Sequence, residues 1–315
     1  MKPEIAVLGS VWTDEVLRAL DGQFACHFPA RMTPDARAGF ERDIAPRIRA
    51  VLTTGTVGLD AAGARVYPSL EIVSVHGVGV DAVDLEAMAA RGIIVTNTPD
   101  VLTEDVADLA VSLLLAAYRS IPLLDRYVRA GHWEEKRPLT PARSLRGKVV
   151  GIYGYGRIGQ AVANRLRAFG MEIRYFQRSE GPEPAARCAS LLELAAVSDF
   201  LVLAAPGGAA TRHAVNAEVL DALGPQGTLV NIARGTVVDE AALVAALADG
   251  RLGAAALDVF EDEPRVPASL RTMDNVVLTP HVGSFTVETR RAMAQLAVGN
   301  LEAHFAGRPA LTPVR

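Results

Sequence analysis

Three stretches of the sequence carry side chains that could act together on a carbonyl group. Arg234 has a fixed planar cation that can hold a carboxylate or polarise a ketone oxygen. His281 can supply or remove a proton near neutral pH. Glu263, bonded to the other ring nitrogen, would fix the tautomer and favour the protonated imidazole. Each residue follows a run that predicts a strand: NIARG (231–235), DVFEDEP (258–264) and TPHVG (279–283). Together they indicate reduction of a carbonyl next to a carboxylate.

Each of the three also has a simpler interpretation. Arg234 could cap a helix, Glu263 could be a solvated loop acid before Pro264, and His281 could be a turn residue after Pro280. Their convergence beside a glycine-rich loop favours the catalytic interpretation.

The glycine-rich loop is GYGRIG (154–159), which lies between a predicted strand and a predicted helix. That context distinguishes a dinucleotide-binding G-x-G-x-x-G from a plain glycine turn, which is the alternative. Gly154 allows the tight turn, Gly156 lets the backbone approach a pyrophosphate, and Gly159 allows close packing of helix and strand. The N–H groups that would face the anion at the helix N-terminus belong to Arg157 and Ile158.

The next predicted strand ends in YFQRSE (175–180), where a dinucleotide site usually has an acid that binds the ribose 2′-hydroxyl. Arg178 and the Ser179 hydroxyl would instead bind a 2′-phosphate. A hydrogen bond to a charged group contributes about 1.5–3 kcal/mol, which corresponds to a roughly 10- to 150-fold preference. We therefore expect NADP(H) as the preferred cofactor and NAD(H) as a second one. In the alternative, Arg178 is a solvated arginine and Glu180 binds the ribose.

The elements that must position these residues alternate between short apolar runs and helical patterns, which predicts an α/β protein with parallel sheets. In the first hundred residues the predicted strands are 5–9, 49–54, 70–77 and 93–99, with helices such as 84–92 between them. From Lys148 a second series predicts strands at 148–154, 171–177, 199–205, 227–233, 253–260 and 275–280. Six strands with these crossovers make a complete doubly wound dinucleotide-binding fold.

The segment 286–307 predicts a helix that is too long for a linker, and we expect it to return to the first domain. The expected domains are therefore a substrate domain of residues 1–98 and 285–315 and a dinucleotide-binding domain of residues 99–284. The cleft between two such domains is the expected active site.

Composition excludes several other classes of protein. The net charge is −4, and no basic stripe with interleaved aromatics is present, which argues against nucleic acid as a ligand. The longest apolar stretch, 106–118, is interrupted by Asp108 and is too short to cross a membrane. Cys26 and Cys188 lie far apart and outside any metal-ligand spacing, so we expect no metal site and two reduced thiols in a cytoplasmic protein.

The chain resembles the D-isomer-specific 2-hydroxyacid dehydrogenase family over nearly its whole length. The resemblance rests on GYGRIGQAVANRLRAFGM, NIARGTVVDEAAL, AALDVFEDEP and LTPHVGS, in this order and at family spacing. It implies a flavodoxin-like substrate domain and a Rossmann domain. It also implies that Arg234 binds the substrate carboxylate and carbonyl, that His281 is the general acid–base, and that Glu263 pairs with His281.

The resemblance implies further contacts. The loop HGVGVD (76–81) would bind the substrate carboxylate through the amides of Val78 and Gly79, although a strand-ending turn is an alternative, and we interpret His76 as structural. Asp258 would lie near the nicotinamide amide. The remaining cofactor contacts would be Ala205, Pro206, Thr211, Ile232, Ala233, Arg234, His281 and Gly283.

Departures from the family pattern narrow the expectation. Phe176 replaces the usual aspartate, and the following Gln-Arg-Ser resembles the NADPH-preferring glyoxylate and hydroxypyruvate reductases. The chain ends at Arg315, without the regulatory extension of many phosphoglycerate dehydrogenases. Glu263 argues against the formate dehydrogenase branch, which has glutamine in this role.

We therefore expect NADPH-dependent reduction of a small 2-keto acid, hydroxypyruvate or glyoxylate, to a D-2-hydroxy acid. One alternative is the same chemistry on a bulkier acid such as phenylpyruvate or hydroxyphenylpyruvate. Another is a dinucleotide-sensing, corepressor-like binding protein. The apolar segment 112–133, which ends at Trp133, indicates a homodimer interface or, alternatively, interdomain packing.

Overall fold

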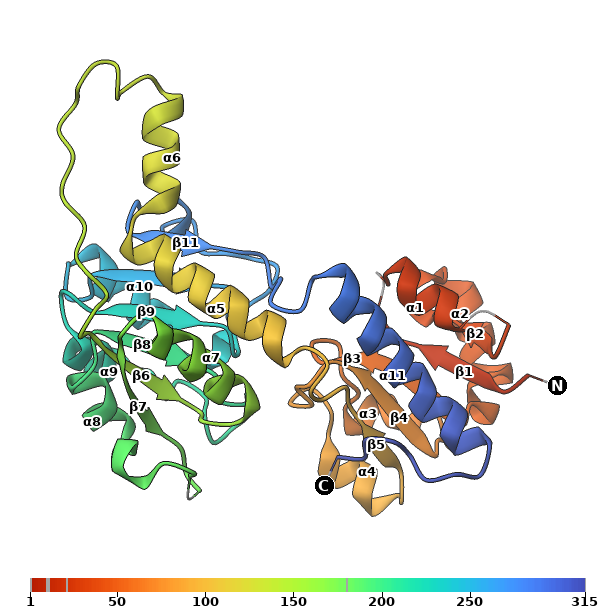
Figure 1. Ribbon diagram of the computed structural model, residues 1–315. Coiled ribbons are helices and arrows are strands. Elements are labelled where there is room, and N and C mark those ends of the chain that lie inside the picture. Colours follow the sequence, from red (N-terminus) through yellow and green to blue (C-terminus); the bar gives the residue numbers. More distant parts are fainter. Residues whose placement is uncertain (1, 10–11, 21, 180, 315) are drawn as a thin grey trace. The chain divides into compact units, whose positions relative to one another are not determined.

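The computed structural model describes residues 2–9, 12–20, 22–179 and 181–314. The chain forms two compact units (Figure 1). Unit 1 consists of Met1–Leu102 and Phe285–Arg315, and unit 2 of Thr103–Ser284. The chain therefore first passes from unit 1 to unit 2 where helix α5 begins. This is four residues after the domain boundary that the sequence predicted between residues 98 and 99.

Unit 1 is built on a five-stranded parallel sheet in the order β2-β1-β3-β4-β5. The strands are β1 Glu4–Val7, β2 Ala25–His27, β3 Ala50–Thr54, β4 Ile72–His76 and β5 Ile94–Thr96. This is the strand order of a flavodoxin-like fold, as expected. The prediction omitted β2, because its three half-buried residues, Ala-Cys-His, form no apolar run.

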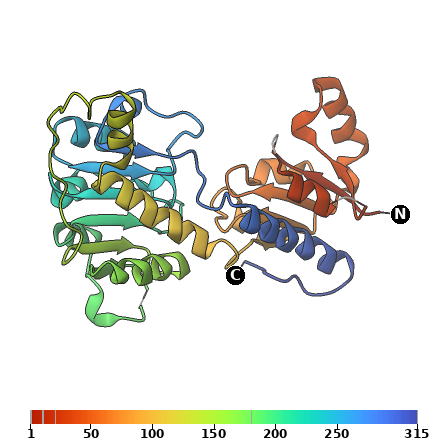
Figure 2. The ribbon, with the colours of Figure 1, turned by 45° about the horizontal axis from the view of Figure 1, so that its top comes forward.

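Helices cover both faces of this sheet. They are α1 Asp14–Leu20, α2 Pro34–Asp43, α3 Ala61–Arg65, α4 Leu85–Ala90 and α11 Val287–Phe305, with 3₁₀ turns η1 Pro29–Arg31 and η2 Ala45–Arg47. The long helix α11 does return to this unit, where it packs against α1 and β4 (Figure 1 and Figure 2). The buried Ser74 hydroxyl of β4 donates to the Ala297 carbonyl of α11 at 2.8 Å.

Unit 2 contains all six predicted strands, in one parallel sheet of order β11-β10-β9-β8-β6-β7. They are β6 Val149–Tyr153, β7 Glu172–Phe176, β8 Phe200–Leu203, β9 Thr228–Asn231, β10 Ala254–Leu257 and β11 Val276–Leu278. Beyond β7, an isolated parallel bridge between Tyr175 and Arg187 occupies the place of one more strand. With that bridge the sheet has the strand order of a Rossmann fold, and the strand order reverses between β6 and β8, which are parallel neighbours.

The helices of unit 2 form two layers, with α6 outside both (Figure 1). They are α5 Thr103–Tyr118, α6 Ile121–Arg129, α7 Arg157–Ala168, α8 Leu191–Ala196, α9 Ala217–Leu223 and α10 Glu240–Ala248, with 3₁₀ turns η3 Pro184–Ala186, η4 Gly235–Val237 and η5 Leu270–Thr272. Helices α5 and α7 pack together, and α8, α9 and α10 form the second layer. In the described part of the chain, no single helix is long and apolar enough to cross a membrane. Helices α5 and α6 together have the length and apolar composition of a membrane span, but they are bent by 59° relative to each other.

His76, the last residue of β4, is a buried titratable group with a consequence for stability. Its side chain is 4% exposed. Burial, and next the charge of Arg290, lower the pKa of His76 from 6.5 to about 4. The unfolded chain therefore binds a proton below pH 6.5 that the folded chain does not bind. The stabilising contribution is present above pH 6.5 and is lost as the pH falls towards 4.

We expect this residue to make the protein sensitive to acid. At pH 5 the loss is 6.5 − 5 = 1.5 units, or about 2 kcal/mol at 1.36 kcal/mol per unit. Urea unfolding at pH 7.5 and pH 5 should therefore show a free-energy drop about 2 kcal/mol larger for the wild type than for His76→Leu. An equal drop in the free energy of unfolding of the two proteins would contradict the lowered pKa of His76.

Candidate active site

The three chemistry-bearing stretches meet at one edge of the unit 2 sheet. Arg234 follows β9, Asp258 follows β10, and His281 lies three residues after β11. These strands are parallel neighbours, so their carboxyl ends lie side by side. The Arg234 charge also contributes to the lowered pKa of Glu263.

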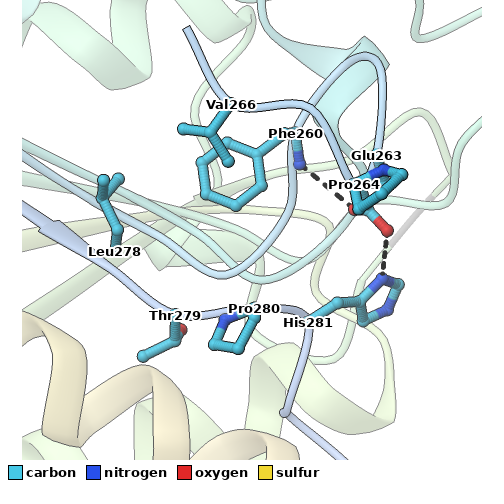
Figure 3. A pocket seen from close by; sticks show the side chains of 8 residues that line it. All are labelled: Phe260, Glu263, Pro264, Val266, Leu278, Thr279, Pro280 and His281. Carbon is cyan, nitrogen blue, oxygen red and sulfur yellow. Dashed lines mark hydrogen bonds and ion pairs between the residues drawn. The ribbon is translucent and has the colours of Figure 1, made fainter. Parts of the chain in front are cut away.

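His281 and Glu263 form a hydrogen-bonded pair (Figure 3). The imidazole Nδ1 lies 2.8 Å from Glu263 Oε2. The other carboxylate oxygen, Oε1, accepts the Phe260 N–H at 3.1 Å. With Nδ1 bonded to the carboxylate, Nε2 is the nitrogen that remains for proton exchange.

The protonation state of Glu263 suits this pairing. Burial by itself would raise the pKa of Glu263. The hydrogen bond and charge of His281, the Phe260 N–H and the charge of Arg234 act in the opposite direction and hold this pKa below its ordinary value. Glu263 is therefore an anion at neutral pH, and an anion beside an imidazole stabilises its protonated, donating form.

Asp258 organises the turn that carries His281. Its buried carboxylate accepts hydrogen bonds from the Thr279 hydroxyl at 2.7 Å and from the N–H groups of Val282 and Gly283 at 2.8 and 2.9 Å. Its carbonyl accepts the His281 N–H at 2.8 Å. His281 has a φ of +54°, a left-handed conformation that is uncommon outside glycine and here is held by these bonds. The expected contact of Asp258 with the nicotinamide amide stays a prediction.

Asn231 holds the backbone around Arg234 in the same way. Its side-chain amide donates to the Arg234 carbonyl and its side-chain oxygen accepts the Ala233 N–H, both at 3.0 Å. Arg234 Nη1 donates to the Ala233 carbonyl at 2.7 Å, and Ile232 and Ala233 are buried. Asn231 and Thr279 were not singled out from the sequence, although both lie within the motifs. The feature that could have identified them is a short polar side chain at the end of a strand, where it can bind the backbone of the following turn.

An apolar cavity of about 250 Å³ adjoins the Glu263–His281 pair (Figure 3). Besides the pair, it is lined by Phe260, Pro264, Val266, Leu278, Thr279 and Pro280. An apolar surrounding strengthens the interaction between carboxylate and imidazole.

The glycine loop has the close contacts that its motif requires. Gly154 has a φ of +95°, and a methyl group on it would lie 2.4 Å from the Ala205 nitrogen. A methyl group on Gly159 would lie 2.2 Å from the Gly154 carbonyl oxygen. A methyl group on Gly156 would meet nothing within 4 Å, so the space in front of this residue is open. These three glycines fit a bound pyrophosphate.

Helix α7 begins directly after Gly156. Its hydrogen bonding starts with Gln160, whose N–H donates to the Gly156 carbonyl at 2.9 Å. The N–H groups of the first turn, those of Arg157 and Ile158 among them, therefore need acceptors from outside the helix. An anion is suited to that place.

The loop after β8 lies against the glycine loop through Ala205. The Thr211 hydroxyl donates to the Pro206 carbonyl at 2.7 Å, so it serves to close this loop. The expected cofactor contacts of these three residues stay predictions.

Arg178 and Ser179 are exposed after β7. Burial raises the pKa of the Tyr153 phenol and the charge of Arg178 opposes this, so Arg178 lies near the end of β6. The following segment is tied to α7, because Glu183 accepts from the Tyr155 hydroxyl at 2.8 Å and from Arg167 at 2.6 Å. Glu180 lies outside the described residues.

In unit 1, the loop after β4 presents backbone donors. The Gly77 carbonyl accepts the Thr98 N–H at 2.9 Å, and the Val78 carbonyl accepts from the Asn97 side chain at 2.8 Å. No acceptor for the N–H groups of Val78 and Gly79 is found among the described residues. This arrangement suits the predicted binding of a carboxylate by these two amides.

Within the described ranges, no group of three or more His, Cys, Asp or Glu side chains is arranged to hold a metal ion. A doubly wound sheet with this glycine loop, and with an Arg–Glu–His set at its carboxyl edge, defines an NAD(P)-dependent dehydrogenase.

Comparison with known proteins gives the family. Residues 111–283 match the model of the D-isomer specific 2-hydroxyacid dehydrogenase, NAD binding domain. The chain is 54% identical over 284 residues to hydroxyphenylpyruvate reductase of Plectranthus scutellarioides, covering 90% of each chain. It is 54% identical over 269 residues to glyoxylate/hydroxypyruvate reductase A of Arabidopsis thaliana, covering 85% of each.

A solved structure agrees with these relatives. NADPH-dependent glyoxylate/hydroxypyruvate reductase of Sinorhizobium meliloti, in complex with NADP and malonate, matches with a TM-score of 0.90 and 44% identity over 100% of this chain and 97% of that one. The protein therefore belongs to the D-isomer specific 2-hydroxyacid dehydrogenase family.

Proposed function

We propose that the protein is an NADPH-dependent reductase of small 2-keto acids, with hydroxypyruvate and glyoxylate as substrates and a D-2-hydroxy acid as product. The observation that carries this proposal is the Glu263–His281 pair beside Arg234 at the carboxyl edge of a dinucleotide-binding sheet. The Arabidopsis relative is named for both substrates, which supports the choice.

Each residue has a defined chemical part. When bound, the reduced nicotinamide supplies the hydride for the keto carbon. His281 donates a proton from Nε2 to the keto oxygen, and Glu263 stabilises the imidazolium before transfer. Arg234 stabilises the negative charge that develops on that oxygen. The N–H groups of Val78 and Gly79 bind the substrate carboxylate.

A panel of keto acids tests this function. With NADPH and the wild-type enzyme, we expect the highest kcat/KM for hydroxypyruvate or glyoxylate. A higher value for hydroxyphenylpyruvate or phenylpyruvate would favour the second candidate, to which the Plectranthus relative's name points. Binding of NADPH without its oxidation by any acid would favour the sensor class instead.

We also propose a homodimer. Helix α6 has no buried residue, and its apolar side chains Ile121, Leu123, Leu124 and Val128 are exposed. Trp133, just beyond it, is 69% exposed. A second copy of the chain would cover this face. Light scattering should give twice the mass of the chain, and Val128→Glu should shift it towards the monomer. A monomeric wild type would contradict the proposal.

We further propose that the enzyme is cytoplasmic. Cys26 and Cys188 are both thiols and take part in no disulfide, which suits a reducing compartment.

A further inference from the structure

A group of charged side chains in unit 2 converges on Glu261, two residues before the catalytic Glu263. Arg212 Nη2 and His213 Nε2 each donate a hydrogen bond to Glu261 Oε1 at 2.8 Å. A carboxylate oxygen only accepts, so His213 Nε2 carries a proton. The Glu261 N–H in turn donates to Glu240 Oε1 at 3.1 Å. Glu261 therefore ties the loop after β8 and the start of α10 to the segment that carries Glu263.

The same segments are in contact through their backbones. Gly235, which directly follows the catalytic arginine, has no room for a side chain, because a methyl group there would overlap the peptide group between Phe260 and Glu261. The His213 N–H donates to the Thr236 carbonyl at 2.8 Å. The contact of Gly235 with Phe260 prevents a closer approach, but the dispersion attraction of such a contact is small. The side-chain bonds of Glu261 oppose separation of the two backbones.

The two sides of this contact carry the catalytic groups. Arg234 directly precedes Gly235, and Glu263 Oε1 accepts the Phe260 N–H at 3.1 Å (Figure 3). Glu263 Oε2 lies 2.8 Å from His281 Nδ1. A change in the spacing between residues 235 and 260 would therefore move the Glu263–His281 pair relative to Arg234.

The backbone of His213 supports a functional part for these bonds. Its φ is +49°, in the left-handed region that residues other than glycine seldom adopt. Conformations of this kind persist where surrounding bonds hold them, and they are concentrated at functional sites. Here the N–H and the imidazole of His213 are both bonded, to Thr236 and to Glu261.

We propose that Glu261, Arg212 and His213, the Glu261 cluster, are positioning residues that hold the Glu263–His281 pair at a fixed separation from Arg234. The proton from His281 and the positive charge of Arg234 must meet at one keto oxygen, and such an arrangement tolerates little displacement. The inference rests on the proposed function, which assigns those two roles.

The other charged groups near Glu261 provide a control. Glu240 is half-buried, and burial raises its pKa; the Glu261 N–H opposes this rise, and the charges of Glu261 and Asp262 add to it. Asp262 and Arg265 are exposed and pair with each other at 2.6 Å. Asp262 is therefore a neighbouring carboxylate that is bonded to Arg265 instead of to the cluster.

The pH–rate profile with hydroxypyruvate and NADPH separates positioning from a merely structural role. Because the Glu263 anion favours the protonated imidazole of His281, a displaced carboxylate should let activity disappear at lower pH on the alkaline side. We expect Glu261→Ala to lower kcat about 10- to 100-fold and to move this alkaline limb down by about half a pH unit or more. Loss of folded protein alone would lower the rate without moving the limb. An unmoved limb would overturn the proposal.

Three further variants test whether the bonds of the cluster, rather than its charges, are responsible. Asp262→Asn removes a neighbouring carboxylate but leaves the bonds of Glu261, so its alkaline limb should stay at the wild-type pH. His213→Ala should behave like Glu261→Ala. His213→Gln, which keeps an N–H donor and does not titrate, should restore the wild-type limb. A limb that moves as far in Asp262→Asn as in Glu261→Ala, or equally in both His213 variants, would contradict the proposal.

A double variant separates this inference from the proposed function. In a Glu263→Gln background, Glu261→Ala should move the alkaline limb no further, because no carboxylate remains to be positioned. A further shift as large as that in the wild-type background would remove this inference alone. Absence of turnover of any keto acid by the wild type would remove the proposed function itself.

Discussion

Replacing His281 by alanine is expected to lower kcat by about 10²–10⁴-fold, the usual contribution of a positioned general acid. The keto oxygen would then receive its proton from water, while the cofactor and the carboxylate keep their own binding groups. The loss should therefore fall mainly on kcat rather than on KM. The turn itself is held by Asp258 through backbone and Thr279 bonds, not through the imidazole, so the variant should fold.

Steady-state assays with hydroxypyruvate and NADPH measure this effect, and quenching of protein fluorescence by NADPH checks that the nucleotide still binds. Glu263→Gln is the companion variant. It keeps a side chain of the same shape next to Nδ1 but removes the charge that favours the protonated ring. Its pH–rate profile should lose activity at lower pH on the alkaline side than the wild type does. Full turnover in His281→Ala would eliminate the assigned role.

The core of this site could be predicted from the sequence because of how parallel sheets are built. Side chains that follow neighbouring strands are delivered to one edge, so the motifs around Arg234, Glu263 and His281 locate the site without knowledge of any contact. The glycine loop is predictable for a similar reason. Its spacing encodes a turn and two close approaches, and the structure has those approaches at Gly154 and Gly159.

Other features depend on contacts that no local pattern encodes. Asp258 was expected near the cofactor, and its bonds to the His281 turn are visible only once β10 and β11 lie side by side. Arg187 forms a one-residue bridge rather than a strand, so it leaves no apolar run. The structural role expected for His76 stays a prediction, and the effect of the Arg290 charge on it is visible only once α11 has returned to unit 1.

Arg178→Ala is expected to remove the preference for NADPH over NADH. In the wild type this preference should be roughly 10- to 150-fold, since a guanidinium hydrogen-bonded to a 2′-phosphate contributes about 1.5–3 kcal/mol. Arg178 is suited to this because it is exposed and follows β7, where Phe176 replaces an acid that would repel the phosphate. Glu183, held by Tyr155 and Arg167, fixes the segment beyond it to α7.

The ratio of kcat/KM with NADPH to that with NADH is the quantity to measure, with hydroxypyruvate as substrate. Arg174→Ala is the matched control, because Arg174 lies on the same strand and pairs with Glu172 at 2.6 Å. That variant should keep the wild-type ratio. If the wild type uses both nucleotides equally and Arg178→Ala changes nothing, Arg178 is a surface residue and the cofactor assignment falls.

The chemistry of the site would survive such a result. In the sheet order, β7 is one edge strand and β11 is the other, with β9 and β10 next to β11. Arg178 and the Arg234–Glu263–His281 set thus lie at opposite ends of the same carboxyl edge. Substitutions that far apart and without shared partners add in free energy. The double variant Arg178→Ala, Glu263→Gln should therefore show the cofactor ratio of the first change and the pH–rate profile of the second.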